Sequence, residues 1–408
     1  DPLLMRSDHG LERAGWGVLD AGAILAVLKP AIHFARGVWR KVSGWESESG
    51  VRLSREDAKR ALDEAQEVFG GTEWGAAERF AVQQSAVCER AEPRERGSPR
   101  KNTTLFGYGH YARTCVLPSV RQWADVRCIH EVDPALHDTS LGVVWDTSPR
   151  WRGGEAADVA LIAGYHHTHA PLAAEAARRG CAAIVEKPVA TTHQQLDALL
   201  EAARAHGAPV FAAFQKRYAQ ETEWLREDLA LEGPSTPCDY ACIVHEVALP
   251  ERHWYRWPVS GSRVLSNGCH WLDHFLVLNP GSPVRHVGAH ASSSGTIVAY
   301  AELDNGACFS MTLGARGSGR LGTRELVEVT RGGRTARLLD MRRYVAEDGR
   351  RVLRRASLDK HAPYANMYQS MGRALARGHL APFDTIEALE RSARAALVLD
   401  DCIRRELS

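Results

Sequence analysis

The chain has 408 residues, enough for two or three domains that each hold a hydrophobic core. Its 51 lysines and arginines nearly balance its 50 aspartates and glutamates, so overall charge does not point to nucleic acid or an anionic membrane as a partner. Apolar residues make up 44% of the chain and charged residues 25%, as in an ordinary soluble globular protein.

The nine cysteines are scattered along the chain without a CxxC pair, and several lie in apolar, strand-like runs. We therefore expect buried, reduced thiols in a cytoplasmic protein rather than a disulfide framework. Cys238 and Cys242 lie close together in the sequence, but no second pair of ligands follows them. A zinc site is not expected at this pair.

Residues 1–100 are predicted to form a helical N-terminal extension that carries no recognisable catalytic motif. Its most hydrophobic stretch, 15–39, is interrupted by Asp20, Lys29 and Pro30. A membrane-spanning helix needs about 20 mostly apolar residues. We expect an amphipathic helix here and no stable membrane span. The charged, proline-containing run 91–103 is predicted to be a linker.

From residue 103 onward, apolar strands alternate with helices. Strands are expected at 103–109, 126–132, 157–164, 181–187 and 208–214, with helices ending near 123 and spanning 169–180 and 192–207. Continuous apolar strands predict a parallel sheet covered on both faces. Residues 235–357 are mostly strand-like, and two helices close the chain. The sequence thus predicts an α/β domain and a strand-rich domain with a cleft between them.

The first of these strands runs into a glycine-rich turn. Gly107, Gly109 and Ala112 form a GxGxxA pattern that precedes a helix, as in dinucleotide-binding folds. Glu131 and Asp133 follow the next strand, 24 and 26 positions after Gly107. A carboxylate there would bind the adenosine ribose and repel a 2′-phosphate, which favours NAD while leaving NADP open. The sequence does not decide between the two carboxylates.

A second unusual stretch is "AAIVEKPVATT", in which an apolar strand ends in Glu186, Lys187 and Pro188. Ligands bind beyond the carboxyl ends of the strands of an open parallel sheet. Pro188 favours an extended backbone before it, which would direct the Lys187 ammonium to a substrate hydroxyl and the nicotinamide ribose. The alternative is a local ion pair between Glu186 and Lys187 at a surface turn.

Four motifs in this order resemble the Gfo/Idh/MocA oxidoreductase family: "GYGHYA", "GYHHTHAPLAAEAARRGCAAIVEKPVATT", "FAAFQKRY" and "GSRVLSNGCHWLDH". The resemblance covers roughly 103–405. It implies an α/β fold in which a Rossmann-type parallel sheet domain precedes an α+β domain with a large, mostly antiparallel open-faced sheet. We expect domains at 1–100, 101–218 and 219–408, with the final helices packing back on the Rossmann domain.

The resemblance also implies site residues. Lys187 and His270 are the expected catalytic groups, since removing a hydride from an alcohol requires a proton acceptor. The expected cofactor contacts are Gly107, Gly109, His110, Tyr111, Ala112, Glu131, Asp133, His166, His169, Glu186 and Lys187. The expected substrate contacts are Lys187, Arg217, Tyr218, Ser266, Asn267, His270 and Asp273.

Two features of this set are a serine in place of the usual aspartate and a run of closely spaced histidines. Many family members have an aspartate where this chain has Ser266, so Ser266 and Asn267 are expected to hold substrate hydroxyls by neutral hydrogen bonds. The histidines of "GYHHTHA" suggest a metal site, but His167 and His169 would diverge on a helix and no acidic or cysteine partner is nearby in sequence. No metal is expected.

The sequence therefore predicts an NAD(P)-dependent oxidoreductase acting on a secondary alcohol of a sugar or sugar derivative, with nucleotide-linked sugars among the candidates. A homodimer or homotetramer is expected, with no nucleic-acid partner. One alternative is a redox-neutral enzyme that retains NAD during elimination or epimerisation. Another is a non-catalytic dinucleotide-sensing or partner-binding protein, in which residues 1–100 are the interaction element.

Overall fold

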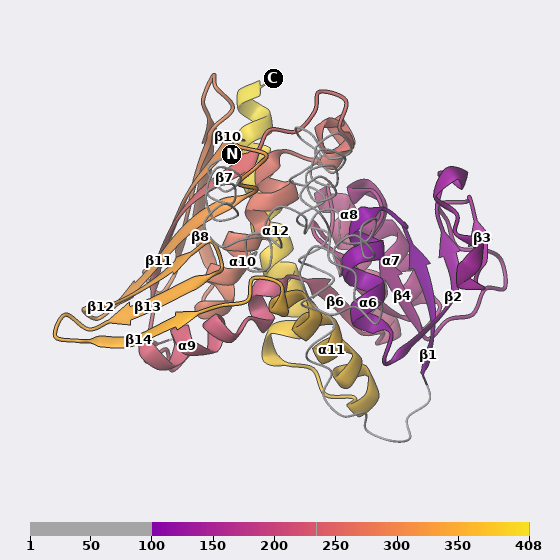
Figure 1. Ribbon diagram of the computed structural model, residues 1–408, viewed down its shortest axis with the longest axis horizontal. Helices are drawn as coiled ribbons and strands as arrows, with labels where there is room; N and C mark the ends of the chain where they lie inside the picture. Colours follow the sequence, from indigo (N-terminus) through magenta and orange to yellow (C-terminus); the bar gives the residue numbers. More distant parts are fainter. Residues whose placement is uncertain (1–99, 234, 408) are drawn as a thin grey trace, which may run out of the picture. The chain divides into compact units, whose positions relative to one another are not determined.

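The computed structural model describes residues 100–233 and 235–407. Its first sheet is six-stranded and parallel, in the order β3-β2-β1-β4-β5-β6 (Figure 1). This is the strand order of a dinucleotide-binding Rossmann domain, so the predicted fold class is confirmed. The strands are β1 (Lys101–Phe106), β2 (Ala124–His130), β3 (Val144–Asp146), β4 (Val159–Ile162), β5 (Ala182–Glu186) and β6 (Val210–Ala213).

The helices of this part begin and end where local sequence signals place them. α7 (His169–Arg178) buries its alanines against β4 and β5, while α8 (His193–His206) packs on α7. The Thr192 side chain caps α8 by accepting a hydrogen bond from the Gln195 amide, and Gly207 ends the helix in a left-handed conformation. The helix after the glycine turn begins as the π-helix η2 (Ala112–Val116) and continues as α6 (Leu117–Val120). β3 was not predicted from the sequence.

The second sheet has eight strands in the order β14-β13-β12-β11-β7-β10-β9-β8, and only β7 and β10 run parallel. Buried and exposed side chains alternate along β7, β9, β10 and β11. α10 (Cys269–Leu278) packs against β7 and β10 on the buried face. The strands are β7 (Asp239–Val247), β8 (Val284–Ala291), β9 (Ile297–Leu303), β10 (Cys308–Gly317), β11 (Arg324–Arg331), β12 (Arg334–Leu339), β13 (Arg343–Glu347) and β14 (Val352–Ser357).

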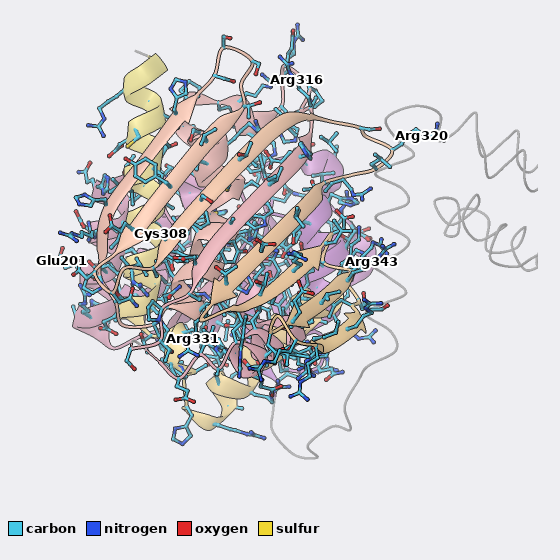
Figure 2. All side chains as sticks on the ribbon, turned by 90° about the vertical axis from the view of Figure 1, so that its left-hand side faces the viewer. Glu201, Cys308, Arg316, Arg320, Arg331 and Arg343 are labelled. Atoms are coloured by element: carbon cyan, nitrogen blue, oxygen red, sulfur yellow. The ribbon has the colours of Figure 1, made fainter. Side chains whose placement is uncertain are left out.

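The other face of the eight-stranded sheet is open among the described residues. Figure 2 looks onto it and shows side chains standing out from the strands. Ile243, Val298, Tyr300 and Leu326 are large apolar residues that are exposed on these strands. The expected open-faced, mostly antiparallel sheet is therefore present.

The last two helices pack against elements of the six-stranded sheet domain and of the eight-stranded sheet domain. α11 (Ala362–Arg377) packs against α6, β6 and the 3-10 turn η6 (Gln215–Tyr218), whereas α12 (Ile386–Leu407) packs against α8, α10 and β8. α9 (Gln220–Asp228) lies between η6 and β7 in the chain. The predicted domain boundaries themselves stay a prediction. The expected helices of 1–100 lie outside the described residues, and none of the described helices is long and apolar enough to cross a membrane.

A buried ion pair connects η6 to α10. Arg217 binds Asp273 through two parallel contacts, Nη2 to Oδ1 at 2.6 Å and Nε to Oδ2 at 3.0 Å. Both side chains are at most 1% exposed. The fork of the guanidinium matches the carboxylate, and this geometry offsets the cost of removing both charges from water.

Replacing Arg217 with methionine should lower the free energy of unfolding by about 3–5 kcal/mol, because Asp273 would be left as an unpaired buried charge. Urea unfolding followed by circular dichroism measures this loss. The matched control is Arg337→Met, which removes the exposed ion pairs with Glu328 and Glu347 and should cost at most about 1 kcal/mol. Equal losses in the two variants would contradict the assignment.

Candidate functional site

The glycine turn lies where the strand order of the Rossmann sheet reverses, between β1 and β4. Gly107 has a φ of +91°, and a Cβ there would lie 2.6 Å from Gly164 Cα at the end of β4. Only glycine fits this position. Gly109 differs, since a Cβ would meet no heavy atom within 4 Å. The open space beside Gly109 fits the close approach of a pyrophosphate to the backbone, and Ala112 is buried against the sheet.

The two candidate carboxylates have different surroundings. Glu131 is 8% exposed and accepts hydrogen bonds from the Tyr108 amide, at 2.7 Å, and from the Asp133 amide, at 2.9 Å. It therefore lies against the glycine turn. The Asp133 carboxylate instead caps the following 3-10 turn by accepting from the Ala135 amide. Contact of either carboxylate with an adenosine ribose stays a prediction.

Glu186 and Lys187 point to different partners at the end of β5. The buried Glu186 carboxylate accepts a hydrogen bond from the Tyr368 hydroxyl of α11. Lys187 donates instead to the backbone carbonyl of Ser266, 3.1 Å away. The alternative of a local surface ion pair does not fit these contacts. The Lys187–Pro188 peptide bond is cis.

The electrostatic environment keeps Lys187 charged. Burial disfavours the ammonium form, but Tyr255, Cys269 and Glu186 act in the opposite direction, and the pKa of Lys187 lies above its ordinary value. The Tyr255 ring centre lies 5.9 Å from the ammonium nitrogen. Burial raises the pKa of Glu186. Lys187 is thus a fixed positive charge rather than a base at neutral pH.

His270 is the second residue of α10 and lies close to this charge. The residue is 8% exposed, and its buried Nδ1 has no hydrogen-bond partner among the described residues. Burial, followed by the positive charges of Lys187 and Lys216, holds the pKa of His270 well below its ordinary value. The imidazole is therefore neutral. An unpartnered buried nitrogen beside an ammonium group is an available proton acceptor, as a group that handles a substrate proton requires.

The segment before α10 is the π-helix η9 (Val264–Gly268). Its Ser266 is buried and supplies a carbonyl, not a side-chain oxygen, to Lys187. The Asn267 amide donates to Glu246 at the end of β7, and Glu246 also pairs with Arg263. Single π-turns often occur at functional sites. Direct contacts of Ser266 and Asn267 with a substrate stay a prediction.

Three further expected substrate contacts take part in intramolecular bonds. Arg217 and Asp273 form the buried ion pair described above. The Tyr218 hydroxyl donates to Asp384 at 2.5 Å, and burial raises the pKa of Asp384 to about 6. None of these contacts includes Lys187 or His270. Arg217, Tyr218 and Asp273 hold η6 against the helices in this structure, and substrate binding by them stays a prediction.

Two histidines expected at the cofactor are buried and bonded to backbone carbonyls. His166 Nδ1 lies 3.0 Å from the Ser260 oxygen, and His169 Nδ1 lies 2.8 Å from the Pro188 oxygen. Burial is the main cause that lowers the pKa of His166 to about 2 and that of His169 to about 4. His169 thereby ties the start of α7 to the segment that carries Lys187. Direct cofactor contacts of both rings stay predictions.

The remaining expected contacts flank the glycine turn. His110 is exposed, and its carbonyl accepts a hydrogen bond from the Thr114 hydroxyl. Tyr111, like Tyr368, lowers the pKa of Glu186 and so opposes the effect of burial on that carboxyl. Sequence reasoning missed Tyr368 and Glu246. Tyr368 is one of several tyrosines on a C-terminal helix, and Glu246 follows a β-strand as many carboxylates do, so neither carries a local signal.

A six-stranded Rossmann sheet followed by an open-faced sheet is the architecture of one class of dinucleotide-dependent oxidoreductases. The profile of the Gfo/Idh/MocA family, described as an oxidoreductase family with an NAD-binding Rossmann fold, matches residues 123–214. The recognition of this family from the sequence motifs is confirmed. No curated protein matches the chain.

Several solved structures are similar to this one over most of the chain. UDP-N-acetylglucosamine 3-dehydrogenase GnnA from Acidithiobacillus ferrooxidans matches with a TM-score of 0.62 and 18% identity, covering 76% of this chain and 100% of that one. A Gfo/Idh/MocA oxidoreductase from Vibrio cholerae matches with 0.58 and 20%, covering 75% and 98%. The WlbA dehydrogenase from Bordetella pertussis, in complex with NADH and UDP-GlcNAcA, matches with 0.59 and 18%, covering 76% and 98%. These likenesses show the fold.

Gly107→Ala and Gly109→Ala should affect different properties of the protein. Gly107→Ala places a Cβ 2.6 Å from Gly164 and forces a positive φ, so it should lower the free energy of unfolding by about 2 kcal/mol or more. Gly109→Ala meets only open space and should leave stability unchanged. It should weaken NADH binding about tenfold or more, or 1.4 kcal/mol, by blocking the pyrophosphate. Thermal unfolding and calorimetric titration with NADH measure the two effects. Unchanged NADH affinity in Gly109→Ala would contradict the proposed turn.

The buried histidines predict a pH-dependent stability. His274 bonds to the Thr222 and Tyr240 hydroxyls, and burial holds its pKa well below the ordinary value, near 6.5, that it regains on unfolding. Below that pH the unfolded chain binds one more proton at this residue. The free energy of unfolding therefore decreases as the pH is lowered, by about 1.4 kcal/mol per pH unit for each such histidine.

His274→Asn isolates this contribution from that of carboxyl groups such as Asp384, whose raised pKa acts in the opposite direction. Between about pH 6 and pH 5, which lies below the ordinary histidine pKa of about 6.5, the variant's free energy of unfolding should depend on pH less steeply than that of the wild type. The difference between the two slopes should approach the uptake of one proton. Parallel curves for the two proteins would show that His274 is charged in the folded state.

Proposed function

We propose that this protein is an NAD(P)-dependent oxidoreductase that transfers a hydride between nicotinamide and a secondary alcohol of a sugar or sugar derivative, including nucleotide-linked sugars. The observation that carries the proposal is the bond from the Lys187 ammonium to the Ser266 carbonyl. It brings the end of a Rossmann strand to the segment just before His270. A fixed positive charge and a neutral proton acceptor thus occur together beyond the carboxyl end of β5, the edge of the sheet at which ligands bind in folds of this kind.

The cofactor would be held by this chain's own turn and carboxylate. Backbone amides at Gly107 and Gly109 would receive the pyrophosphate, and Glu131 would accept hydrogen bonds from the adenosine ribose hydroxyls. A buried carboxylate at that position disfavours a 2′-phosphate, which supports NAD over NADP. When bound, the cofactor supplies a nicotinamide ring that accepts or donates a hydride.

The protein's contribution to the chemistry is proton transfer and charge stabilisation. When the carbinol C–H bond breaks and its electron pair leaves as hydride to the nicotinamide, the hydroxyl would lose its proton to the His270 imidazole and the oxygen would become a carbonyl. Lys187 would donate a hydrogen bond to this oxygen and stabilise its negative charge during transfer. Glu186, held by Tyr368, would balance the lysine charge on the other side of the strand end.

Two similar structures support a nucleotide-linked sugar as the substrate class. One is named a UDP-N-acetylglucosamine 3-dehydrogenase and the other contains NADH and UDP-GlcNAcA. In this chain, Trp254 and Trp257 lie near the ring of Tyr165, just beyond β4, and Tyr255 packs against Trp254. Aromatic faces of this kind can stack on a sugar or a base. The open face of the eight-stranded sheet would serve as the contact between subunits of a homodimer or homotetramer.

Lys187→Met should lower kcat by about 10²-fold or more, because the developing oxyanion loses its positive partner. His270→Ala should lower it by about 10²–10⁴-fold. NADH affinity should change only a few-fold in either variant. Lys101→Met, at the opposite end of β1, is the matched lysine control and should retain wild-type turnover.

The assay is a screen of sugars and UDP-sugars with NAD, read by NADH absorbance, after native mass spectrometry for retained cofactor. Wild-type turnover in Lys187→Met or His270→Ala would refute the mechanism. Retained NAD with sugar conversion but no NADH release would instead indicate the redox-neutral alternative. NADH binding without turnover of any sugar would favour a dinucleotide sensor.

A further inference from the structure

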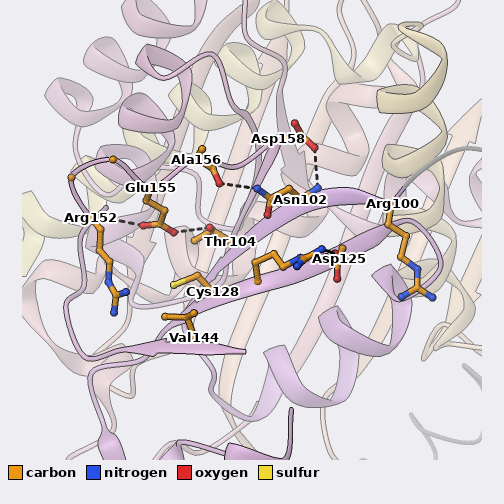
Figure 3. Close-up of a pocket in the computed structure, with 13 residues that line it drawn as sticks. Arg100, Asn102, Thr104, Asp125, Cys128, Val144, Arg152, Glu155, Ala156 and Asp158 are labelled. Carbon is orange, nitrogen blue, oxygen red and sulfur yellow. Dashed lines mark hydrogen bonds and ion pairs between the residues drawn. The ribbon is translucent and has the colours of Figure 1, made fainter. Parts of the chain in front are cut away.

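A cysteine, a histidine and a glutamate meet on one face of the Rossmann sheet, apart from the residues around Lys187. Cys128 and His130 are two positions apart on β2, so the strand directs both side chains to the same face. Glu155 reaches them from the irregular connection between β3 and β4. Their three ligating atoms lie within 4.8 Å of one another. Cys128 and Glu155 also line a pocket of 590 Å³, which gives access to the cluster (Figure 3).

The hydrogen bonds of His130 define the state of its ring. Nδ1 lies 2.9 Å from the Ser148 carbonyl oxygen, which can only accept, so Nδ1 carries a proton. Nε2 faces the two Glu155 oxygens at 3.1 Å and 3.3 Å. A neutral imidazole would present a lone pair to this carboxylate. A second proton on the ring, a proton on the carboxyl group or a cation between the groups would each satisfy this contact.

The distances favour a cation. Zinc bonds of about 2.3 Å to sulfur and about 2.0 Å to nitrogen or oxygen, at tetrahedral angles, separate sulfur from nitrogen by about 3.5 Å and nitrogen from oxygen by about 3.3 Å. Here Cys128 Sγ lies 3.6 Å from His130 Nε2, and the Glu155 oxygens lie 3.1 Å and 3.3 Å from it. A single metal ion would account for the carboxylate contact and the thiol contact together.

Surrounding groups orient the cluster as outer contacts orient metal ligands. The Thr104 hydroxyl donates to Glu155 Oε1 at 2.7 Å, and the Arg152 amide donates to Oε2 at 3.1 Å, as Figure 3 shows. The carbonyl of Ser148 fixes the tautomer of His130 that leaves Nε2 for a metal. A thiolate and a carboxylate together neutralise a divalent ion, so little net charge would be buried.

We propose that Cys128, His130 and Glu155 bind a divalent cation of the zinc type, with a fourth coordination position open to the pocket for water. The ion would fasten the connection 147–158 to β2, directly before Glu131. No α-helix occurs between β2 and β4 in the described chain, so a metal would take over the covering role that a crossover helix has elsewhere in the sheet. The expectation of no metal rested on the histidines of 166–169 and on Cys238 and Cys242, which are different residues.

The test is titration of the metal-free full-length protein with Co²⁺, followed by competition with Zn²⁺. We expect one Co²⁺ per chain, with thiolate-to-cobalt charge-transfer absorption and the d–d spectrum of a tetrahedral ion, and displacement by Zn²⁺. Cys128→Ser should abolish the charge-transfer absorption. Glu155→Gln, which keeps the side-chain size, should weaken Co²⁺ binding at least tenfold. Zn²⁺ should raise the thermal midpoint of the wild type but not of these variants.

Cys308→Ser is the matched control, since Cys308 is an exposed free cysteine on β10. It should bind Co²⁺ as the wild type does. If Cys128→Ser does not fold, the wild-type spectrum together with Glu155→Gln decides the question. The proposal is overturned if the wild type shows no stoichiometric binding, or if binding with charge-transfer absorption persists unchanged in Cys128→Ser or in Glu155→Gln.

Discussion

A lysine ammonium at the end of a buried strand must find an oxygen partner, because an unpaired charge removed from water costs several kcal/mol. Lys187 meets this requirement through the Ser266 carbonyl, which belongs to the segment leading into α10. Glu186, one residue earlier, turns to the Tyr368 hydroxyl of α11. These two bonds connect β5 to two separate later segments of the chain. Together with the Arg217–Asp273 pair between η6 and α10, they help to hold His270 relative to the Rossmann sheet.

The same constraint explains the charge states of Lys187 and His270. The ammonium is retained because Tyr255, Cys269 and Glu186 outweigh the effect of burial, and the positive charge in turn contributes to keeping His270 neutral. A charged donor and a neutral acceptor are the pair that alcohol oxidation requires. In a polar solvent these two groups would titrate almost independently. Burial couples them, and the proposed mechanism gives each a separate role.

Sequence reasoning performed best where chemistry is local. Gly107 needs a positive φ and a close backbone approach, and both requirements are visible in a strand–glycine–helix pattern. The alternation of apolar strands and helices was sufficient for the Rossmann sheet. Long-range partners were not predictable in this way. That Arg217 pairs with Asp273, or that Tyr368 meets Glu186, depends on how distant segments pack, and nothing within a few residues of either side chain encodes it.

The cluster of Cys128, His130 and Glu155 illustrates the same limit. Two of its members are adjacent on one face of a strand, but the third arrives from a connection 25 positions after His130 that has no regular structure. A spacing-based search for metal ligands has no means of joining them. Geometry supplies what spacing could not, since the distances from His130 Nε2 to the Cys128 sulfur and to the Glu155 oxygens agree with those of a tetrahedral site.

The central claim is that the glycine turn, Lys187 and His270 surround one bound dinucleotide. A crystal structure of the protein with NADH tests it most directly. The account predicts the pyrophosphate against the backbone of Gly107 and Gly109, the adenosine ribose at Glu131, and the nicotinamide beside Lys187 and His270. A dinucleotide bound elsewhere on the protein, or a nicotinamide remote from Lys187, would contradict it.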